Sequence, residues 1–250
     1  MKTPCEHDGL AHAAVVDLGS FTQNGVAVVF GAGGGIGRAL IEAIRGAECF
    51  EHVIAFSRST SPSIDLQNEA SLEGAVASAS AQGELRLVID ATGFLHDKHQ
   101  EPEKTWRQLD ANNLARSFAL NVTGPALIMK HVLPRLPRSG KAVFATLSAR
   151  VGSISDNRLG GWYSYRASKA ALNQLVRTAA IELNRRSPEA LCIALHPGTV
   201  ATALSAPFAA TGLNIHSPSE AARHLLTVIE QLTEDSTGGF FDWRGQQVPW

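Results

Sequence analysis

The sequence predicts one doubly wound α/β domain, in which helices cover both faces of a mainly parallel sheet. Short apolar runs recur along the chain with helical stretches between them, as in sheets built from strand–helix–strand units. A glycine-rich loop follows the first run and leads directly into a helical pattern. The 250 residues, 44% of them hydrophobic, can fill one large core, so a single domain is expected.

Six apolar runs are expected to form the strands. They are VAVVF (26–30), HVIAFS (52–57), LRLVID (85–90), KAVFATLS (141–148), LCIALH (191–196) and GGFFDW (238–243). The pattern also allows a short strand near 63–66, and we expect a mainly parallel sheet of seven strands. The domain is expected to span 25–250, after an N-terminal extension, 1–24, that is either a loose tail or an oligomer contact.

Helical periodicity marks three stretches between the strands, namely 37–46, 110–136 and 163–186. Pro125 is expected to bend or interrupt the second helix, and Pro188 to end the third. The segment before the last helix reads as a mobile insertion, in which residues 203–217 would form a substrate loop.

The balance of charges excludes several classes of partner. Twenty-two basic and 23 acidic residues give a formal net charge of -1 with no dense basic block, so neither nucleic acid nor an anionic membrane is an expected partner. No apolar run is long enough for a membrane span, and the first residues lack the apolar region of a secretory signal. Three scattered cysteines and histidines without metal-ligand spacing predict no disulfide framework and no metal site. A cytoplasmic protein that acts on small molecules fits best.

The glycine loop GAGGGIGRAL (31–40) predicts a nucleotide site. Glycine lets the chain turn sharply and approach a pyrophosphate, and the N-terminus of the following helix offers unpaired N–H groups to the phosphates. The spacing from Gly31 through Gly35 to Gly37 is Gly-x-x-x-Gly-x-Gly, which differs from the common dinucleotide pattern. A flexible turn that binds nothing is the alternative, and the strand–loop–helix context favours the nucleotide.

A second chemical pattern lies in YSYRASK (163–169). Tyr165 and Lys169 are four residues apart and share one face of the expected helix, whereas Tyr163 has Ala167 at that offset. An ammonium nearby lowers the pKa of a tyrosine and makes it a usable general acid. A surface lysine beside a half-buried tyrosine is the alternative. The proton-donor hypothesis is favoured by the order of the other elements: a nucleotide loop after the first strand, a serine ending the strand before this helix, and a Pro–Gly turn after the next strand.

With these elements in this order, the sequence resembles the short-chain dehydrogenase/reductase family from about residue 26 to residue 250. The resemblance rests on GAGGGIG (31–37), DATG (90–93), FALNVTGP (118–125), FATLSARVGSI (144–154), YRASK (165–169) and HPGTVAT (196–202). The stretches GGWYSYRASKAALNQL (160–175) and FFDWRGQQVPW (240–250) look most like the branch of C-factor and sniffer-type carbonyl reductases. The resemblance implies a Rossmann-type fold.

The resemblance further implies a catalytic tetrad of Asn121, Ser148, Tyr165 and Lys169. Tyr165 would donate a proton to the substrate oxygen, and Ser148 would hydrogen-bond that oxygen as negative charge develops on it. Lys169 would hold the nicotinamide ribose and tune Tyr165. Asn121 would lie where its helix is disturbed and hold a water that links Lys169 to solvent. A strand-end cap, a helix-bend residue and a solvated lysine are the structural alternatives for Ser148, Asn121 and Lys169.

The cofactor is expected to be NADP(H) rather than NAD(H). Enzymes that prefer NAD commonly have an acidic residue after the second strand, whereas this chain has Ser57 and Arg58, and an arginine accommodates a 2'-phosphate. Arg58 as an ordinary surface residue is the alternative. The resemblance implies that Asp65 contacts the adenine and that Gly198 and Val200 approach the nicotinamide. The full set of expected cofactor contacts is Gly31, Gly33, Gly35, Ile36, Gly37, Ser57, Arg58, Asp65, Leu66, Ala91, Thr92, Gly93, Pro197, Gly198, Val200 and Thr202.

Three positions depart from the family pattern. Phe30 replaces a threonine before the first glycine, and Asp90 replaces an amide. The step of 17 residues from Ser148 to Tyr165 is longer than in many members, which predicts an extra loop, SISDNRLGG (153–161), beside the substrate. No tetrad residue is lost.

The expected function is therefore NADP(H)-dependent hydride transfer between the nicotinamide and a carbonyl or alcohol substrate. The alternative is a cofactor-binding signalling or sensor protein of the C-factor type with little turnover. The resemblance implies a homodimer or homotetramer.

Overall fold

The structure is a computed structural model that describes residues 15–208 and 214–250. Six parallel strands form its main sheet in the order β2–β1–β3–β4–β5–β8. Their bounds are β1 Gly25–Phe30, β2 Phe50–Phe56, β3 Leu85–Asp90, β4 Ala142–Leu147, β5 Ala190–His196 and β8 Phe240–Asp242. All six expected strands are confirmed. Every residue of β1, β3 and β4 is buried, which explains why these strands are apolar without alternation.

The prediction of a seventh strand in this sheet is wrong. Residues 63–66 form no strand because their backbone donors bond within a local turn: Ile64 N donates to Ser57 O at 3.0 Å, and Asp65 N to Ser71 Oγ at 3.0 Å. A separate pair of two-residue strands, β6 Thr199–Val200 and β7 Ile215–His216, lies outside the main sheet.

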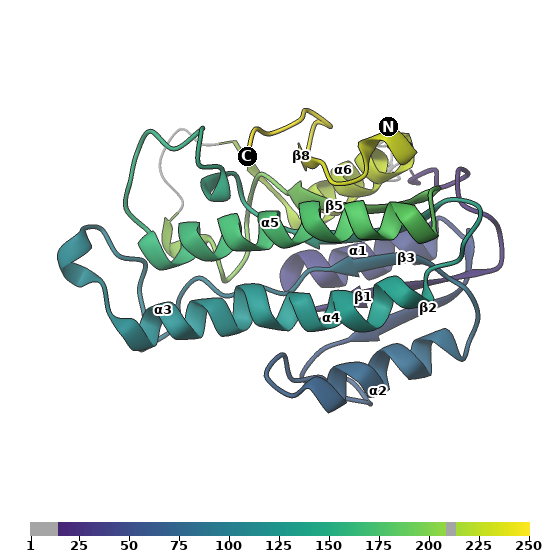
Figure 1. Ribbon diagram of the computed structural model, residues 1–250, viewed down its shortest axis with the longest axis horizontal. Coiled ribbons are helices and arrows are strands. Elements are labelled where there is room, and N and C mark those ends of the chain that lie inside the picture. Colours follow the sequence, from purple (N-terminus) through teal and green to yellow (C-terminus); the bar gives the residue numbers. More distant parts are fainter. Residues whose placement is uncertain (1–14, 209–213) are drawn as a thin grey trace, which may run out of the picture.

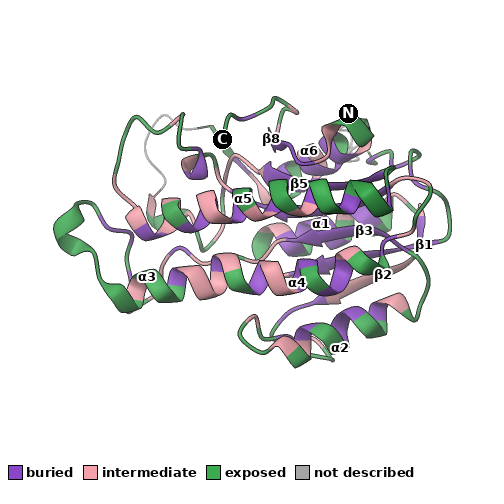
Figure 2. Cartoon of the chain, viewed as in Figure 1, coloured by how far each residue is buried: buried purple, intermediate pink, exposed green. Residues whose placement is uncertain are grey.

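Helices cover both faces of the sheet and enclose two apolar clusters (Figures 1 and 2). On one face lie α1 (Gly35–Gly46) and α6 (Pro218–Gln231); the other is covered by α2 (Glu69–Ser80), α4 (Gly124–Val132) and α5 (Tyr163–Arg186). Helix α2 lies in a stretch for which the sequence predicted no element, EASLEGAVASAS, whose apolar and small residues mark no distinct face. It begins at a capping residue, Asn68, whose side chain accepts from Ser71 N.

The segment before β1 packs against the α1–α6 layer. Val16, Leu18 and Phe21 are buried in the apolar cluster of that face. Ser20 donates to the carboxylate of Glu230 through its backbone N at 2.8 Å and its hydroxyl at 2.6 Å. The contacts of the domain thus begin well before residue 25, and residues 1–14 of the expected extension lie outside the described part.

A π-helical turn interrupts the helix expected over 110–136. Helix α3 (Ala111–Phe118) passes through the π-helical turn Ala119–Thr123 into α4, with Pro125 in the first turn of α4. Pro125 has no N–H to donate to the carbonyl of Asn121 four residues earlier, and its ring displaces that carbonyl, so a wider turn forms there. Helix α5 ends at Arg186, before Pro188 as expected.

The order of the strands creates the crevice that holds the site. From β1 the chain moves outward to β2, and from the adjacent β3 it moves the opposite way to β4, so the carboxyl ends of β1 and β3 face a common opening. Part of the expected substrate loop, 209–213, lies outside the described residues; Ala206–Phe208 form a 3₁₀ turn. No helix in the described part of the chain is both long and apolar enough to span a membrane.

Candidate active site

A cavity of about 500 Å³ lies at the carboxyl ends of β1, β2 and β3. Nine of the expected cofactor residues line it: Gly31, Gly33, Ser57, Arg58, Asp65, Leu66, Ala91, Thr92 and Gly93. Five others, Ile36, Pro197, Gly198, Val200 and Thr202, line a second cavity described below. The two remaining expected residues, Gly35 and Gly37, line neither cavity but pack closely against other residues. A Cβ on Gly35 would lie 3.0 Å from Thr202, and one on Gly37 would clash with Gly31 O.

The first cavity fits a dinucleotide. Gly31 has φ +79°, and a Cβ there would lie 2.7 Å from the carbonyl carbon of Ala91, so only glycine permits this turn. Helix α1 starts after Gly34 with no side-chain cap, which leaves the N–H groups of its first turn available to a pyrophosphate. The cavity also borders the tetrad, since a Cβ on Gly93 would lie 3.9 Å from Lys169 Nζ.

The turn after β2 presents hydroxyls and one cation at the far end of this cavity. Ser57 Oγ lies 3.0 Å from Ser59 Oγ, and Ser57 N donates to Thr60 Oγ1 at 2.8 Å, which fixes the turn. Arg58 is exposed and forms no ion pair with any described residue. The turn itself contains no acidic residue that would repel a phosphate.

The second cavity, about 600 Å³, contains Ser148 and Tyr165 on its wall. Tyr165 is half-buried, and its hydroxyl has no hydrogen-bond partner among the described residues. Burial raises the pKa of Tyr165 to about 12. This is opposite to the direction expected from the sequence. The reason is geometric, since Lys169 Nζ lies 5.9 Å from the ring centroid of Tyr165 and is directed to a backbone carbonyl instead.

Lys169 is held in a buried position behind Tyr165. Its side chain is buried, and Nζ donates to Leu147 O, at the end of β4, at 2.8 Å. Burial lowers the pKa of Lys169 to about 8, and the negative charge of Asp90 opposes part of that shift. Lys169 is therefore an ammonium at pH 7 that gives up its proton more readily than an exposed lysine.

Asp90 supplies the negative charge that partly compensates the buried ammonium of Lys169. Its fully buried carboxylate accepts from Thr92 N at 3.0 Å, Thr92 Oγ1 at 2.6 Å and Thr146 Oγ1 at 2.8 Å. Burial raises the pKa of Asp90, while these three donors and Lys169 act in the opposite direction. The departure from the family's amide thus places an acid that ties β3 to β4 beneath the site.

Ser148 has a partner that sequence reasoning missed. Its hydroxyl donates to Asn173 Oδ1 at 2.6 Å, and both residues are buried. Asn173 Nδ2 is buried without a hydrogen-bond partner. The signal was present in the sequence, because Asn173 lies four residues after Lys169 and eight after Tyr165, on the same face of α5.

Asn121 lies in the π-helical turn, where the resemblance places it. Its side chain binds the backbone of Phe94, after β3: Oδ1 accepts from Phe94 N at 2.7 Å, and Nδ2 donates to Phe94 O at 2.8 Å. Nδ2 also donates to Ser168 Oγ, on α5, at 3.1 Å. Asn121 thus connects the cofactor loop to α5. The water link to Lys169 stays a prediction.

Glu103 is a second residue that sequence reasoning missed. It is buried, and its carboxylate accepts from Ser164 N at 3.1 Å and from the Ser164 hydroxyl, while Glu103 O accepts from Trp162 N at 2.5 Å. Trp162, the residue before α5, has φ 53° and offers no side-chain cap. Glu103 therefore caps the helix that carries Tyr165 from a loop far away in the sequence.

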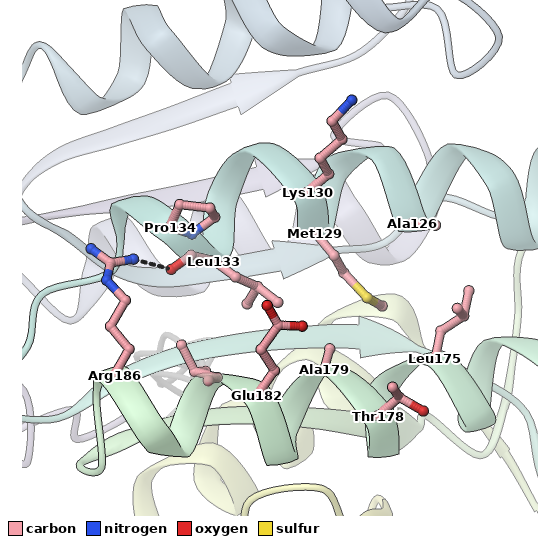
Figure 3. Close-up of a pocket in the computed structure, with 11 residues that line it drawn as sticks. Ala126, Met129, Lys130, Leu133, Pro134, Leu175, Thr178, Ala179, Glu182 and Arg186 are labelled. Atoms are coloured by element: carbon pink, nitrogen blue, oxygen red, sulfur yellow. Dashed lines mark hydrogen bonds between the residues drawn. The ribbon is translucent and has the colours of Figure 1, made fainter.

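A third hollow, a groove of about 490 Å³ between α4 and α5, holds none of the expected site residues (Figure 3). Met129, Leu133 and Leu175 supply apolar walls, and Lys130 and Glu182 bring charges of both signs. Among the described residues, no group of histidine, cysteine and acidic side chains is placed to hold a metal ion.

Comparison with known proteins identifies relatives of this chain in sequence and in fold. The C-signal protein of Myxococcus xanthus is 37% identical over 143 residues, which cover 57% of this chain and 81% of that protein. The 1-hydroxy-2-glutathionyl-2-methyl-3-butene dehydrogenase of Rhodococcus sp. (strain AD45) is 32% identical over 194 residues, 76% of this chain and 79% of that protein. An NADPH-bound carbonyl reductase from chicken fatty liver superposes with a TM-score of 0.77 at 25% identity, over 91% of this chain and 100% of that chain. The carbonyl reductase Sniffer of D. melanogaster has the same fold, with a TM-score of 0.77 at 22% identity and the same coverage. Since the short chain dehydrogenase family matches residues 25–212, well over half of the sequence, the chain belongs to this family of nicotinamide-dependent oxidoreductases.

Proposed function

We propose that this oxidoreductase is an NADP(H)-dependent carbonyl reductase in which Tyr165 is the proton donor. The observation that carries the proposal is that Tyr165, Ser148 and Lys169 lie at the border between the cavity lined by nine expected cofactor residues and the second cavity of about 600 Å³. The names of two structural neighbours, both carbonyl reductases and one NADPH-bound, support the reaction class and the cofactor.

Each tetrad residue has a role that its surroundings support. The bound cofactor would supply hydride to the carbonyl carbon. Tyr165 lines the second cavity and carries its proton at pH 7, as an ordinary tyrosine does, so it would donate that proton to the carbonyl oxygen; its raised pKa makes it a weaker acid and does not itself favour the transfer. Ser148 lines the same cavity and would hydrogen-bond that oxygen by turning its one hydroxyl proton from Asn173 Oδ1 to the substrate. Lys169, fixed by Leu147 O, would hold the ribose hydroxyls, and Asn121 would steady the cofactor loop through Phe94.

The preference for NADP(H) is assigned to Arg58. Its guanidinium lines the first cavity without a carboxylate partner among the described residues, so a 2'-phosphate can bind to it with charge-assisted hydrogen bonds. Ser57 and Ser59 add hydroxyl donors in the same turn.

The direct test is the oxidation of NADPH by the purified chain with a panel of aldehydes, ketones and quinones. Wild type is expected to consume NADPH with at least one carbonyl class, and Tyr165→Phe to bind NADPH without consuming it. A chain that binds NADPH but reduces no member of the panel would favour the second candidate, a cofactor-dependent signalling protein. The 37% identity to C-signal supports that candidate.

We also propose a homo-oligomer in which the α4–α5 groove binds a second copy. An apolar groove bordered by Glu182 and Arg186 can meet its own copy with opposite charges facing (Figure 3). Sedimentation of wild type and Leu175→Glu tests this: a dimer or larger assembly is expected for wild type and a monomer for the variant. A wild-type monomer at micromolar concentration would exclude it.

A further inference from the structure

The substrate cavity carries an excess of positive charge. Its charged wall residues are three arginines, Arg150, Arg158 and Arg166, and one acid, Asp156. His196, also on the wall, adds no charge at pH 7 because burial lowers its pKa to about 4. A cavity with this balance attracts anions and disfavours cations.

Two of the three arginines are committed to other groups. Arg150 donates to Asp156 Oδ2 at 2.5 Å and lies 3.9 Å from Asp242, so acids offset its charge. Arg166 donates to the carbonyl oxygens of Val151, Gly160 and Gly161 at 2.9 to 3.2 Å, which directs its donors into the backbone of the loop.

Arg158 differs from both. It is exposed, lines the cavity, and has no hydrogen bond or ion pair with any residue in the described ranges. The loop that carries it is anchored on each side. Ser155 donates to Trp250 O through its backbone N at 3.1 Å and its hydroxyl at 2.6 Å, and Arg166 holds Gly160 and Gly161. Arg158 therefore projects from a braced loop with its donors available.

The remaining wall is apolar and aromatic. Trp162 contacts Phe208 edge to face at 5.1 Å between ring centroids and lies 6.2 Å from the ring of Tyr165. Leu159, beside Arg158, leaves 92% of its surface exposed at the mouth of the cavity. Such a wall binds a planar or branched hydrocarbon body next to the proton donor.

Building on the proposed function, we propose that Arg158 makes the enzyme selective for carbonyl substrates that carry a carboxylate or another anionic group on an apolar body. The carbonyl group would lie at Tyr165, the hydrocarbon against Trp162 and Phe208, and the anion at Arg158. Because Arg158 is exposed, the gain per contact is that of a partly screened ion pair, and a preference of about fivefold is expected.

The test compares 4-carboxybenzaldehyde with 4-methylbenzaldehyde, which differ in charge at similar size. Wild type is expected to show a kcat/KM about fivefold higher for the carboxylate, expressed in KM and reduced by added salt. Arg158→Ala should abolish this preference and Arg158→Glu should invert it, with the neutral aldehyde changed by less than about twofold. The matched control is Arg138→Ala, an exposed arginine in the turn before β4, at the opposite end of the strands from the site.

A binding measurement keeps the test independent of turnover. Calorimetric titration of the NADP⁺ complex with benzoate and with benzamide, its neutral counterpart, should give tighter binding of benzoate in wild type and equal binding in Arg158→Ala. Equal values for charged and neutral probes in wild type, or an equal loss in the Arg158 and Arg138 variants, would overturn the anion site while leaving carbonyl reduction intact. Failure of both aldehydes and of every other member of the carbonyl panel to oxidise NADPH, with benzoate still selected, would overturn the proposed reaction instead.

Discussion

Replacing Lys169 by methionine is expected to change how the free energy of unfolding depends on pH. This change measures the contribution of the buried Lys169 charge. The pKa of Lys169 is lowered from 10.5 to about 8, a difference worth about 3 kcal/mol. Below about pH 8 both the folded and the unfolded chain carry the proton, and the wild type bears the whole cost of burying the charge. Between about pH 8 and pH 10.5 the unfolded chain binds more protons than the folded one, so wild-type stability rises with pH.

The variant lacks this rise. At neutral pH the removal of the charge is offset by the loss of the bond to Leu147 O, since an unpaired buried carbonyl costs about 1 to 3 kcal/mol, so a single measurement there is not decisive. The decisive quantity is how the difference in unfolding free energy between the two proteins changes with pH. Wild type should gain about 2 kcal/mol of unfolding free energy relative to Lys169→Met between about pH 7.5 and about pH 10.

Urea unfolding of both proteins at the two pH values measures this quantity. Lys130→Met is the matched control: Lys130 is exposed and paired with Glu69 at 2.5 Å, which raises its pKa, so its proton stays bound over this interval and the gap to wild type should not change. Repeating the comparison in an Asp90→Asn background removes the titration of the neighbouring acid. A gap between wild type and Lys169→Met that is the same at both pH values would refute the lowered pKa.

Three further substitutions test the site. Tyr165→Phe is expected to reduce turnover by about 10²- to 10⁴-fold with NADPH binding retained, whereas Tyr163→Phe stays active; a folded Tyr165→Phe enzyme with near-normal kcat would contradict the assignment. Arg58→Ala should weaken NADPH binding about tenfold, the lower end for a charged hydrogen bond because Arg58 is exposed, with NADH little changed, and Arg58→Asp should reverse the preference. The check is kcat/KM for both cofactors, and an unchanged ratio would mark Arg58 as an ordinary surface residue. Asn173→Ala should lower kcat about tenfold without changing the Kd for NADPH, because Ser148 loses its 2.6 Å partner; a changed Kd with normal kcat would show that Asn173 serves the cofactor instead.

The parts of the fold that follow from local pattern could be read from the sequence. Buried strands are continuous apolar runs, and the spacing of Tyr165 and Lys169 places both on one face of α5, as the structure shows. Helix α2 escaped prediction because its alanines and serines mark no clear face. The pattern of 63–66 allows a short strand, whereas the hydrogen bonds that hold these residues in a turn depend on Ser71, which lies outside the segment.

Features that depend on the third dimension could not be predicted in this way. Glu103 caps α5 from 61 residues away, and no periodicity joins the two. The pKa of Tyr165 depends on where the Lys169 ammonium points, and the carbonyl of Leu147, on a separate strand, decides that direction. Helical spacing predicts which side chains share a face, but burial decides which charge state those side chains favour.

The π-helical turn at Ala119–Thr123 makes the site sensitive to chain length as well as to residue type. A wide turn accommodates one residue more than an α-helical turn, and one residue corresponds to about 100° of rotation around a helix axis. Deleting a single residue there would rotate everything on one side of the deletion relative to the other. Asn121 would then lose its hydrogen bonds to the backbone of Phe94, although the residue itself would be unchanged. If the helix that contains this turn is exchanged between relatives, the number of residues in the turn must therefore be kept as well as its side chains.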